Sequence, residues 1–314
     1  MGRVGQSQIA ARPWIVGALV LLAWSSATAQ ELEPGAYQNA PVGVQVLFAG
    51  YGFSSGNVLF DASLPVEGAD ATVHSLSVTY LRTMGIFGRS AKIDGQVVAS
   101  SAHFEGIVAG ELRTRSPKGI GDPRVRLSVN LLGSPALDLP EFAKYRQRTI
   151  LGASVQVAMP FGQYDADRYI NLGANRWATR TELAMSHARG RWVVELGAGA
   201  WFFTDNTQYV NDATLSQRAL KFVKGSAIYS FKRNLWASAS YGYANGGETV
   251  LNSVTQQNLQ RNNRVGATVA LPLTTAGGLR FVFTSGLTTR QGADFDTFAV
   301  GYQHSWAPRP RSAK

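Results

Sequence analysis

Stretches in which apolar and polar residues alternate recur along almost the whole chain, and this pattern most constrains its fold. In residues 122–132, for example, Val125, Leu127 and Val129 alternate with arginines and a serine. Such alternation predicts a β-strand, because successive side chains leave opposite faces of a sheet. A soluble sheet turns its apolar face toward a core, whereas a membrane barrel turns it toward lipid and its polar face toward a wet lumen. A single strand cannot distinguish the two.

The alternating segments predict about twelve strands, an even number that is typical of bacterial outer-membrane barrels. They are residues 43–53, 72–82, 89–100, 122–132, 149–159, 176–187, 191–204, 219–231, 234–244, 264–273, 278–288 and 295–306.

The connections between these segments alternate between short and long. Short links are 83–87, 188–190, 232–233 and 274–277, and long polar links are 162–175, 205–218 and 245–263. Short periplasmic turns and long extracellular loops alternate in this way in membrane barrels, and a soluble sandwich has no reason to sort its loops. Two links depart from the pattern. The link 132–148 is long and is predicted to hold a helical turn at 140–146, and the link 101–121 has room for an additional hairpin.

The N-terminus predicts export. Arg3 and Arg12 precede an apolar run at 14–24, and Ala27 and Ala29 form a small-residue cleavage site. The run is shorter than the roughly 20 residues of a spanning helix, so we predict a secretory signal peptide at 1–29. The predicted barrel occupies residues 30–306, and a short basic tail occupies 307–314.

Composition agrees with a barrel. The chain has no cysteine, which excludes disulfides and thiolate metal sites. Only 16% of its residues are charged, against about 25% in average soluble domains, and no stretch after residue 30 is apolar enough for a membrane helix. We therefore predict an all-β fold, a closed antiparallel transmembrane β-barrel with short periplasmic turns and long extracellular loops.

The alternation assigns side chains to the two faces of the predicted barrel. An arginine facing lipid at mid-membrane would cost about 2–4 kcal/mol, so charged residues within strands are expected to point inward. The predicted lumen lining, a candidate pore constriction, comprises Lys92, Asp94, Arg124, Arg126, Asn130, Arg176, Arg180, Glu182 and Glu195. The predicted aromatic girdle at the membrane interfaces comprises Tyr51, Phe53, Phe202, Phe203, Tyr241, Tyr243, Tyr302 and Trp306.

The formal charge of +10 is scattered along the chain, without the basic runs that nucleic-acid binding needs. Outer-membrane lipids and lipopolysaccharide are therefore the expected anionic partners, or the charge lines the lumen. The four histidines show no metal-ligand spacing, and no serine-nucleophile elbow is present. We expect no cofactor, no metal and no enzymatic activity.

Several stretches resemble a known family. Residues 36–43 (AYQNAPVG), 119–137 (GIGDPRVRLSVNLLGSPAL) and 159–177 (MPFGQYDADRYINLGANRW) are similar to the meta-pathway phenol-degradation family of outer-membrane transporters. Residues 192–206 and 261–273 fit the same pattern. The resemblance implies a channel of the bacterial outer membrane, encoded near pathways for aromatic compounds. It supplies no functional residues to carry over.

Together these observations predict passive passage of small hydrophobic or aromatic solutes. Eight strands enclose only packed side chains and sixteen to eighteen leave an aqueous pore, so a lumen of twelve strands can be open or plugged. Arg124, Arg126, Arg176 and Glu182 are candidates for such a plug.

Two alternatives are a structural or adhesive barrel and a lipid-hydrolysing barrel, which needs a serine beside a histidine at the outer interface. The barrel-assembly machinery is an expected partner. Outer-membrane strands usually end the chain at an aromatic residue, whereas here residues 307–314 follow Trp306.

Overall fold

A computed structural model of the chain describes residues 32–59, 66–108, 110–168 and 170–307. The predicted signal peptide and residues 308–314 of the predicted tail lie outside these ranges. No helix among the described residues is both long enough and apolar enough to cross a membrane.

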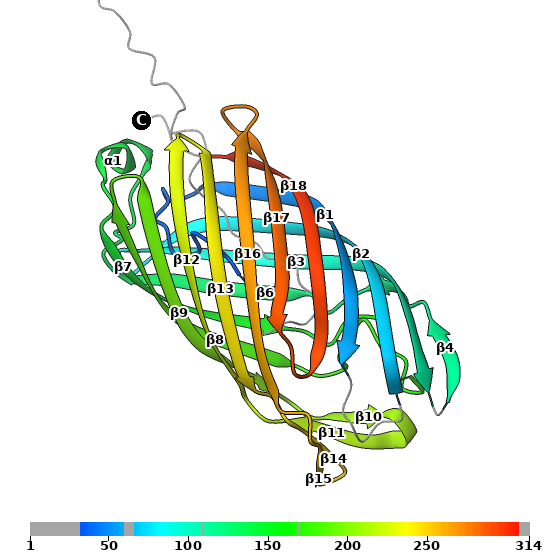
Figure 1. Ribbon diagram of the computed structural model, residues 1–314. Coiled ribbons are helices and arrows are strands. Elements are labelled where there is room, and N and C mark those ends of the chain that lie inside the picture. The colour runs from blue at the N-terminus through cyan, green and yellow to red at the C-terminus, as the bar shows by residue number, and fades with distance from the viewer. Residues whose placement is uncertain (1–31, 60–65, 109, 169, 308–314) are drawn as a thin grey trace, which may run out of the picture.

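Twelve long strands close into one antiparallel barrel (Figure 1). They are β1 (Gln45–Leu59), β2 (Val66–Ile86), β3 (Arg89–Val108), β6 (Arg124–Leu132), β7 (Thr149–Ala158), β8 (Ala178–Arg189), β9 (Trp192–Phe203), β12 (Leu220–Lys232), β13 (Leu235–Gly246), β16 (Gln260–Pro272), β17 (Gly277–Thr288) and β18 (Gly292–Trp306). Each pairs with the next, and β1 pairs with β18 to close the ring. The predicted fold class is confirmed.

The burial of side chains is inverted relative to a soluble sheet. In β6, Arg126, Ser128 and Asn130 are buried, whereas Val125 and Leu127 are 40% and 41% exposed. The apolar side chains of the other strands form the same outward belt, which includes Leu76, Leu183 and Leu196. The predicted orientation, with apolar side chains outward and polar side chains inward, is that of a barrel whose solvent is lipid.

The two ends of the barrel differ. One end carries the short turns and the helix α1 (Leu139–Lys144), which lies in the link predicted to hold a helical turn and begins with a capping box of Asp138 and Glu141. The tight turns at this end place Gly190 at φ 61° and Asn234 at φ 60°, the left-handed region that hairpin turns require.

The other end carries the long loops (Figure 1). β4 (Glu111–Arg115) forms a hairpin with β3, in the link where room for one was noted, and β5 (Lys118–Ile120) also pairs with β3. A small sheet that the sequence did not predict consists of β10 (Asn206–Tyr209), β11 (Ala213–Gln217), β14 (Thr249–Leu251) and β15 (Val254–Thr255), with a 3-10 turn at Val210–Asp212. We take this end as extracellular and the short-turn end as periplasmic.

Candidate functional site: the barrel lumen

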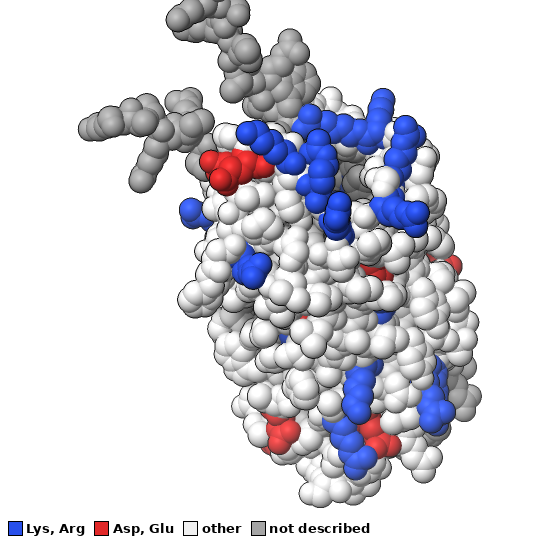
Figure 2. Space-filling model, turned by 90° about the vertical axis from the view of Figure 1, so that its left-hand side faces the viewer, with Lys and Arg blue, Asp and Glu red and all other residues white. Residues whose placement is uncertain are grey.

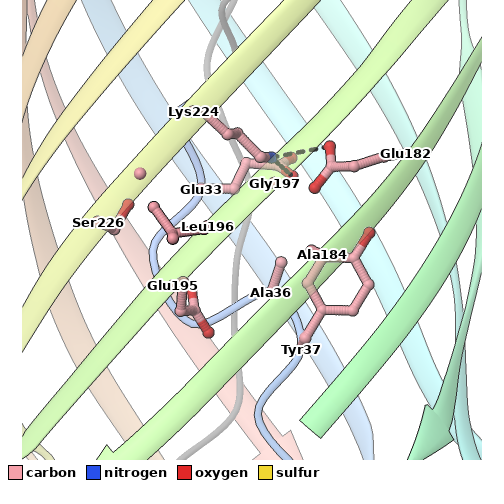
Figure 3. Close-up of a pocket in the computed structure, with 11 residues that line it drawn as sticks. Glu33, Ala36, Tyr37, Glu182, Ala184, Glu195, Leu196, Gly197, Lys224 and Ser226 are labelled. Carbon is pink, nitrogen blue, oxygen red and sulfur yellow. Dashed lines mark ion pairs between the residues drawn. The ribbon is translucent and has the colours of Figure 1, made fainter.

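The residues before β1 lie inside the barrel rather than in its wall. In residues 32–44, which we call the luminal segment, Glu33 is 5%, Tyr37 3% and Ala40 0% exposed. Figure 3 shows Glu33, Ala36 and Tyr37 enclosed by the strands. The sequence alone predicts only that these residues belong to the barrel, whereas the structure separates them from its wall (Figure 3). A Pro- and Gly-rich stretch such as PGAYQNAPVG has no alternation, so its position carried no periodic signal.

A chain of ion pairs ties the start of the luminal segment to the wall. The Glu33 carboxylate accepts a hydrogen bond from Arg126 and lies 3.7 Å from Lys224 Nζ. Arg126 Nε in turn donates to Asp94 of β3 at 3.0 Å. These side chains are 3–10% exposed. Glu33 therefore joins the β6 arginine to the β12 lysine across the lumen.

The same chain of charges continues away from the segment. Lys224 Nζ lies 3.0 Å from Glu182 Oε2, and Arg180 donates to the same oxygen at 2.5 Å. Signs therefore alternate from Asp94 through Arg126, Glu33, Lys224 and Glu182 to Arg180. Buried charges are tolerated only when they are paired in this way, because removal from water costs several kcal/mol per ion.

Wall side chains also hold the backbone of the luminal segment. Lys92 Nζ donates to the carbonyl oxygens of Ala36 and Gln38, at 3.0 and 2.7 Å. Glu195 accepts from the Gly35 N–H, and Asn130 Nδ2 donates to the Tyr37 carbonyl at 3.1 Å. These bonds satisfy backbone groups of residues 35–38, which pair with no strand and would otherwise be buried without partners.

The Tyr37 side chain fits into a gap in the wall. Its hydroxyl lies 3.0 Å from Ser154 Oγ, and its ring packs over Gly152. A Cβ at Gly152 would lie 2.2 Å from Tyr37 Cδ1. Farther along, Thr83 donates to the Pro41 carbonyl at 2.6 Å and accepts from the Val44 N–H at 2.9 Å, which anchors the segment where it joins β1.

Gly152→Ala is expected to displace Tyr37 and raise the fraction of open channels several-fold, because ring and methyl cannot share this space. The measurement is single-channel recording in planar bilayers. Gly95→Ala is the matched control, since a Cβ there meets no atom closer than 3.9 Å. Equal conductance of both variants and the parent would show that Tyr37 does not help to close the lumen.

A small cavity lies between the luminal segment and the wall (Figure 3). It is lined by Glu33, Tyr37, Glu182, Glu195 and Lys224 among others and has a volume of about 10 Å³, room for about one water molecule. At this level the luminal segment occupies part of the lumen and narrows it (Figure 3).

The structure places most of the predicted lumen residues on the inner face. Lys92, Asp94, Arg126, Asn130, Arg180, Glu182 and Glu195 are all buried there. Arg124, at the end of β6, is partly exposed. Arg176 precedes β8, bonds Gln217 and lies 4.7 Å from the centre of the Phe203 ring. Burial lowers the pKa of Arg176 to about 10, against the opposing effect of Asp205 and Asp122, so it stays charged at neutral pH.

One aromatic assignment is wrong. Phe203 points into the lumen, stacked 6.4 Å from Trp201, because adjacent residues of a strand leave opposite faces and Phe202 already points outward. The other girdle residues lie on the outer face, in register with exposed neighbours: Tyr51, Phe53, Phe202, Tyr241, Tyr243, Tyr302 and Trp306.

Among the described residues, four charged residues of the lumen were missed: Glu33, Lys224, Arg264 and Arg280. Arg264, which precedes the alternating residues Val265, Ala267 and Val269, could have been found from that alternation. Glu33 lies in the stretch without alternation, as explained above. Lys224 lies on a strand whose inner face also holds Phe222 and Ile228 and whose outer face holds Lys221, so its pattern is mixed. Arg280, between the outward-facing Leu279 and Phe281, could have been found by the rule that identified Arg126.

Serine and histidine meet at one place on the extracellular side. Ser186 faces the lumen while its neighbour His187 is exposed and bonds Thr149. His103 Nδ1, however, lies 2.9 Å from Ser116 Oγ on the exposed hairpin above β3. Among the described residues no carboxylate bonds the other ring nitrogen of His103, so the pair lacks the orienting group of a triad.

Comparison with known proteins agrees with this architecture. Residues 52–300 match the family described as "Putative MetA-pathway of phenol degradation". The fold is similar to that of the COG4313 outer membrane channel from Pseudomonas putida F1, with a TM-score of 0.73 and 20% identity over 88% of this chain and 100% of that chain. It is also similar to the transport unit of the autotransporter AIDA-I from Escherichia coli, with a TM-score of 0.50 and 8% identity over 84% and 90% of the two chains. No curated protein matches the sequence at a significant level.

Proposed function

The chain belongs to the MetA-pathway phenol-degradation family, and we infer from this premise that it is a channel of the bacterial outer membrane. In this proposal small hydrophobic or aromatic compounds pass through it without energy input, and the luminal segment closes it at rest. The observation that carries the proposal is the segment itself, which fills the lumen without being part of the wall.

The contacts of the segment support a removable closure. Glu33, the backbone around Tyr37, and the Tyr37 hydroxyl are held by wall side chains. No strand of the barrel pairs with residues 32–42, and only Gly43 and Val44 of the segment share backbone hydrogen bonds with Thr83 of β2. Residues 32–42 can therefore leave the lumen without breaking any β-ladder, while Gly43 and Val44 stay bonded to β2. Water that enters in its place would solvate Arg126, Lys224 and Lys92.

Stacked rings and guanidinium groups in the lumen support aromatic solutes. Arg180 lies 4.6 Å from the centre of the Phe222 ring, and Arg280 lies 5.3 Å from the centre of the Trp236 ring. The Arg176–Phe203 contact is of the same kind. Flat rings and guanidinium planes both bind the faces of aromatic compounds, so such surfaces suit the passage of aromatic solutes.

Recordings in planar bilayers, combined with uptake of phenol and benzoate by liposomes, test the proposal. We expect solute flux above that of protein-free liposomes, and a larger flux for Gly152→Ala. Absence of flux and conductance from both proteins, with folding verified by heat-modifiable migration, would overturn it.

The contact between His103 and Ser116 identifies where a lipid hydrolase would have its site. The channel proposal expects no release of fatty acid when the purified barrel is mixed with phospholipid. Hydrolysis that disappears in Ser116→Ala would favour the enzyme instead.

A further inference from the structure

Unpaired basic side chains gather at the periplasmic end of the barrel. Figure 2 shows lysines and arginines crowded at the end where α1 lies. We use the name basic rim for the exposed residues Arg146, Arg148, Arg189, Arg191, Lys232 and Arg233. None of them forms an ion pair with another residue in the described ranges. At this end the acids are Asp138 and Glu141, which bond each other in the cap of α1.

The extracellular end treats its basic residues differently. There Arg113 pairs with Glu111, Arg168 lies 3.7 Å from Asp165, and Arg218 lies 2.7 Å from Glu248. Within the described ranges, these three arginines have acidic partners, whereas the residues of the basic rim have none. Uncompensated positive charge attracts an anion from outside the chain.

The basic rim is continuous because the strands that carry it are neighbours. The Ala188 N–H donates to the Arg148 carbonyl at 2.8 Å, and the Ser230 N–H donates to the Arg191 carbonyl at 2.9 Å. These bonds place Arg148 beside the β8–β9 turn, and that turn beside Lys232 and Arg233 of the β12–β13 turn.

Lipid-facing aromatic side chains lie directly next to the basic rim. Trp192 of β9 and Tyr229 of β12 are paired across the sheet with ring centres 4.8 Å apart, and Phe231 lies 5.0 Å from Tyr229. Trp192 and Phe231 are each 52% exposed. Aromatic side chains of this kind sit at the level of lipid headgroups, which places the basic rim at the level of the lipid phosphates.

We propose that the basic rim and the Trp192–Tyr229–Phe231 cluster bind an anionic phospholipid of the inner leaflet. The guanidinium and ammonium groups bind the phosphate, with arginine able to donate two bonds to it, and the rings pack against the glycerol and the upper acyl chains. A soluble acidic partner would use the charges but not the outward-facing rings, so the rings favour a lipid. The inference rests on the proposed membrane location but not on transport.

Native mass spectrometry of the full barrel with phosphatidylglycerol and phosphatidylcholine tests the proposal. The test variant combines R189Q, R191Q, K232Q and R233Q, and the control removes equal charge at the other end with R113Q, R168Q, R218Q and R290Q. We expect the parent and the control to retain phosphatidylglycerol over phosphatidylcholine, and the test variant to retain several-fold less. A second variant, W192A with F231A, is expected to weaken retention of both lipids.

Equal phosphatidylglycerol retention by the test and control variants would overturn the proposal. Binding of soluble peptidoglycan fragments that competes with the lipid for the basic rim would also overturn the lipid assignment. Liposome flux of the test variant separates this result from the proposed function, because lipid retention can be lost while solute still passes.

Discussion

Deletion of residues 32–40 is expected to convert a closed barrel into an open channel, with a conductance several-fold above that of the intact chain. In the intact protein these residues lie inside the lumen, and the cavity beside Glu33 has a volume of about 10 Å³. A barrel of twelve strands is wider than the eight-stranded barrels that side chains alone can fill. Single-channel recording measures the change.

The deleted barrel is expected to fold, because residues 32–40 belong to none of its strands. Arg126 keeps Asp94 as a partner after the deletion, and Lys92 and Glu195 become accessible to water. Heat-modifiable migration and far-UV circular dichroism verify the fold. If the variant that lacks residues 32–40 folds but its conductance is unchanged, wall side chains close the lumen by themselves. Arg124, Arg126, Arg176 and Glu182 are the predicted candidates for such a plug.

Glu182→Gln is expected to lower the free energy of unfolding by about 3–5 kcal/mol, the usual cost of removing one partner from a buried ion pair. Glu182 is the acceptor for Arg180 at 2.5 Å and lies 3.0 Å from Lys224. Without its charge, Lys224 retains Glu33 at 3.7 Å as an acidic neighbour, and Arg126 already uses that carboxylate. Urea unfolding in detergent micelles, followed by tryptophan fluorescence, gives the difference.

Glu111→Gln is the matched control, because its pair with Arg113 is exposed, with side-chain exposures of 69% and 67%. Exposed pairs contribute about 0–1 kcal/mol. Adding Lys224→Gln to Glu182→Gln is expected to restore part of the lost stability, since one of the two cations that faced the Glu182 carboxylate is removed. If Glu182→Gln lowered the free energy of unfolding by less than Glu111→Gln does, water in the lumen would have to solvate these charges.

The wall of the barrel was predictable because, along each strand, polar side chains that face the lumen alternate with apolar side chains that face lipid. Because a charged side chain such as Arg126 is costly in lipid, it faces the lumen, and its neighbours Val125 and Leu127 then face lipid. The same rule correctly placed Lys92, Asp94, Arg180 and Glu195 on the inner face. The rule is less reliable where a strand has apolar residues on its inner face and charged residues on its outer face. Lys224 lies on such a strand, with Phe222 facing inward and Lys221 facing outward. Phe203 shows the opposite error, in which clustering of aromatic residues was given more weight than the strict alternation of the strand.

The sequence by itself determined the number of strands, their order, the long and short ends of the barrel, and which face of each strand meets lipid. These properties follow from local periodicity, which a chain carries without reference to distant residues. Only the tertiary structure decided that residues 32–44 occupy the lumen. Their partners, Arg126, Lys92, Asn130 and Glu195, come from separate strands that meet around Glu33 and Tyr37 only after the barrel has closed. A segment without periodicity, held by contacts across roughly 50 to 160 positions of sequence, has no local pattern to reveal it.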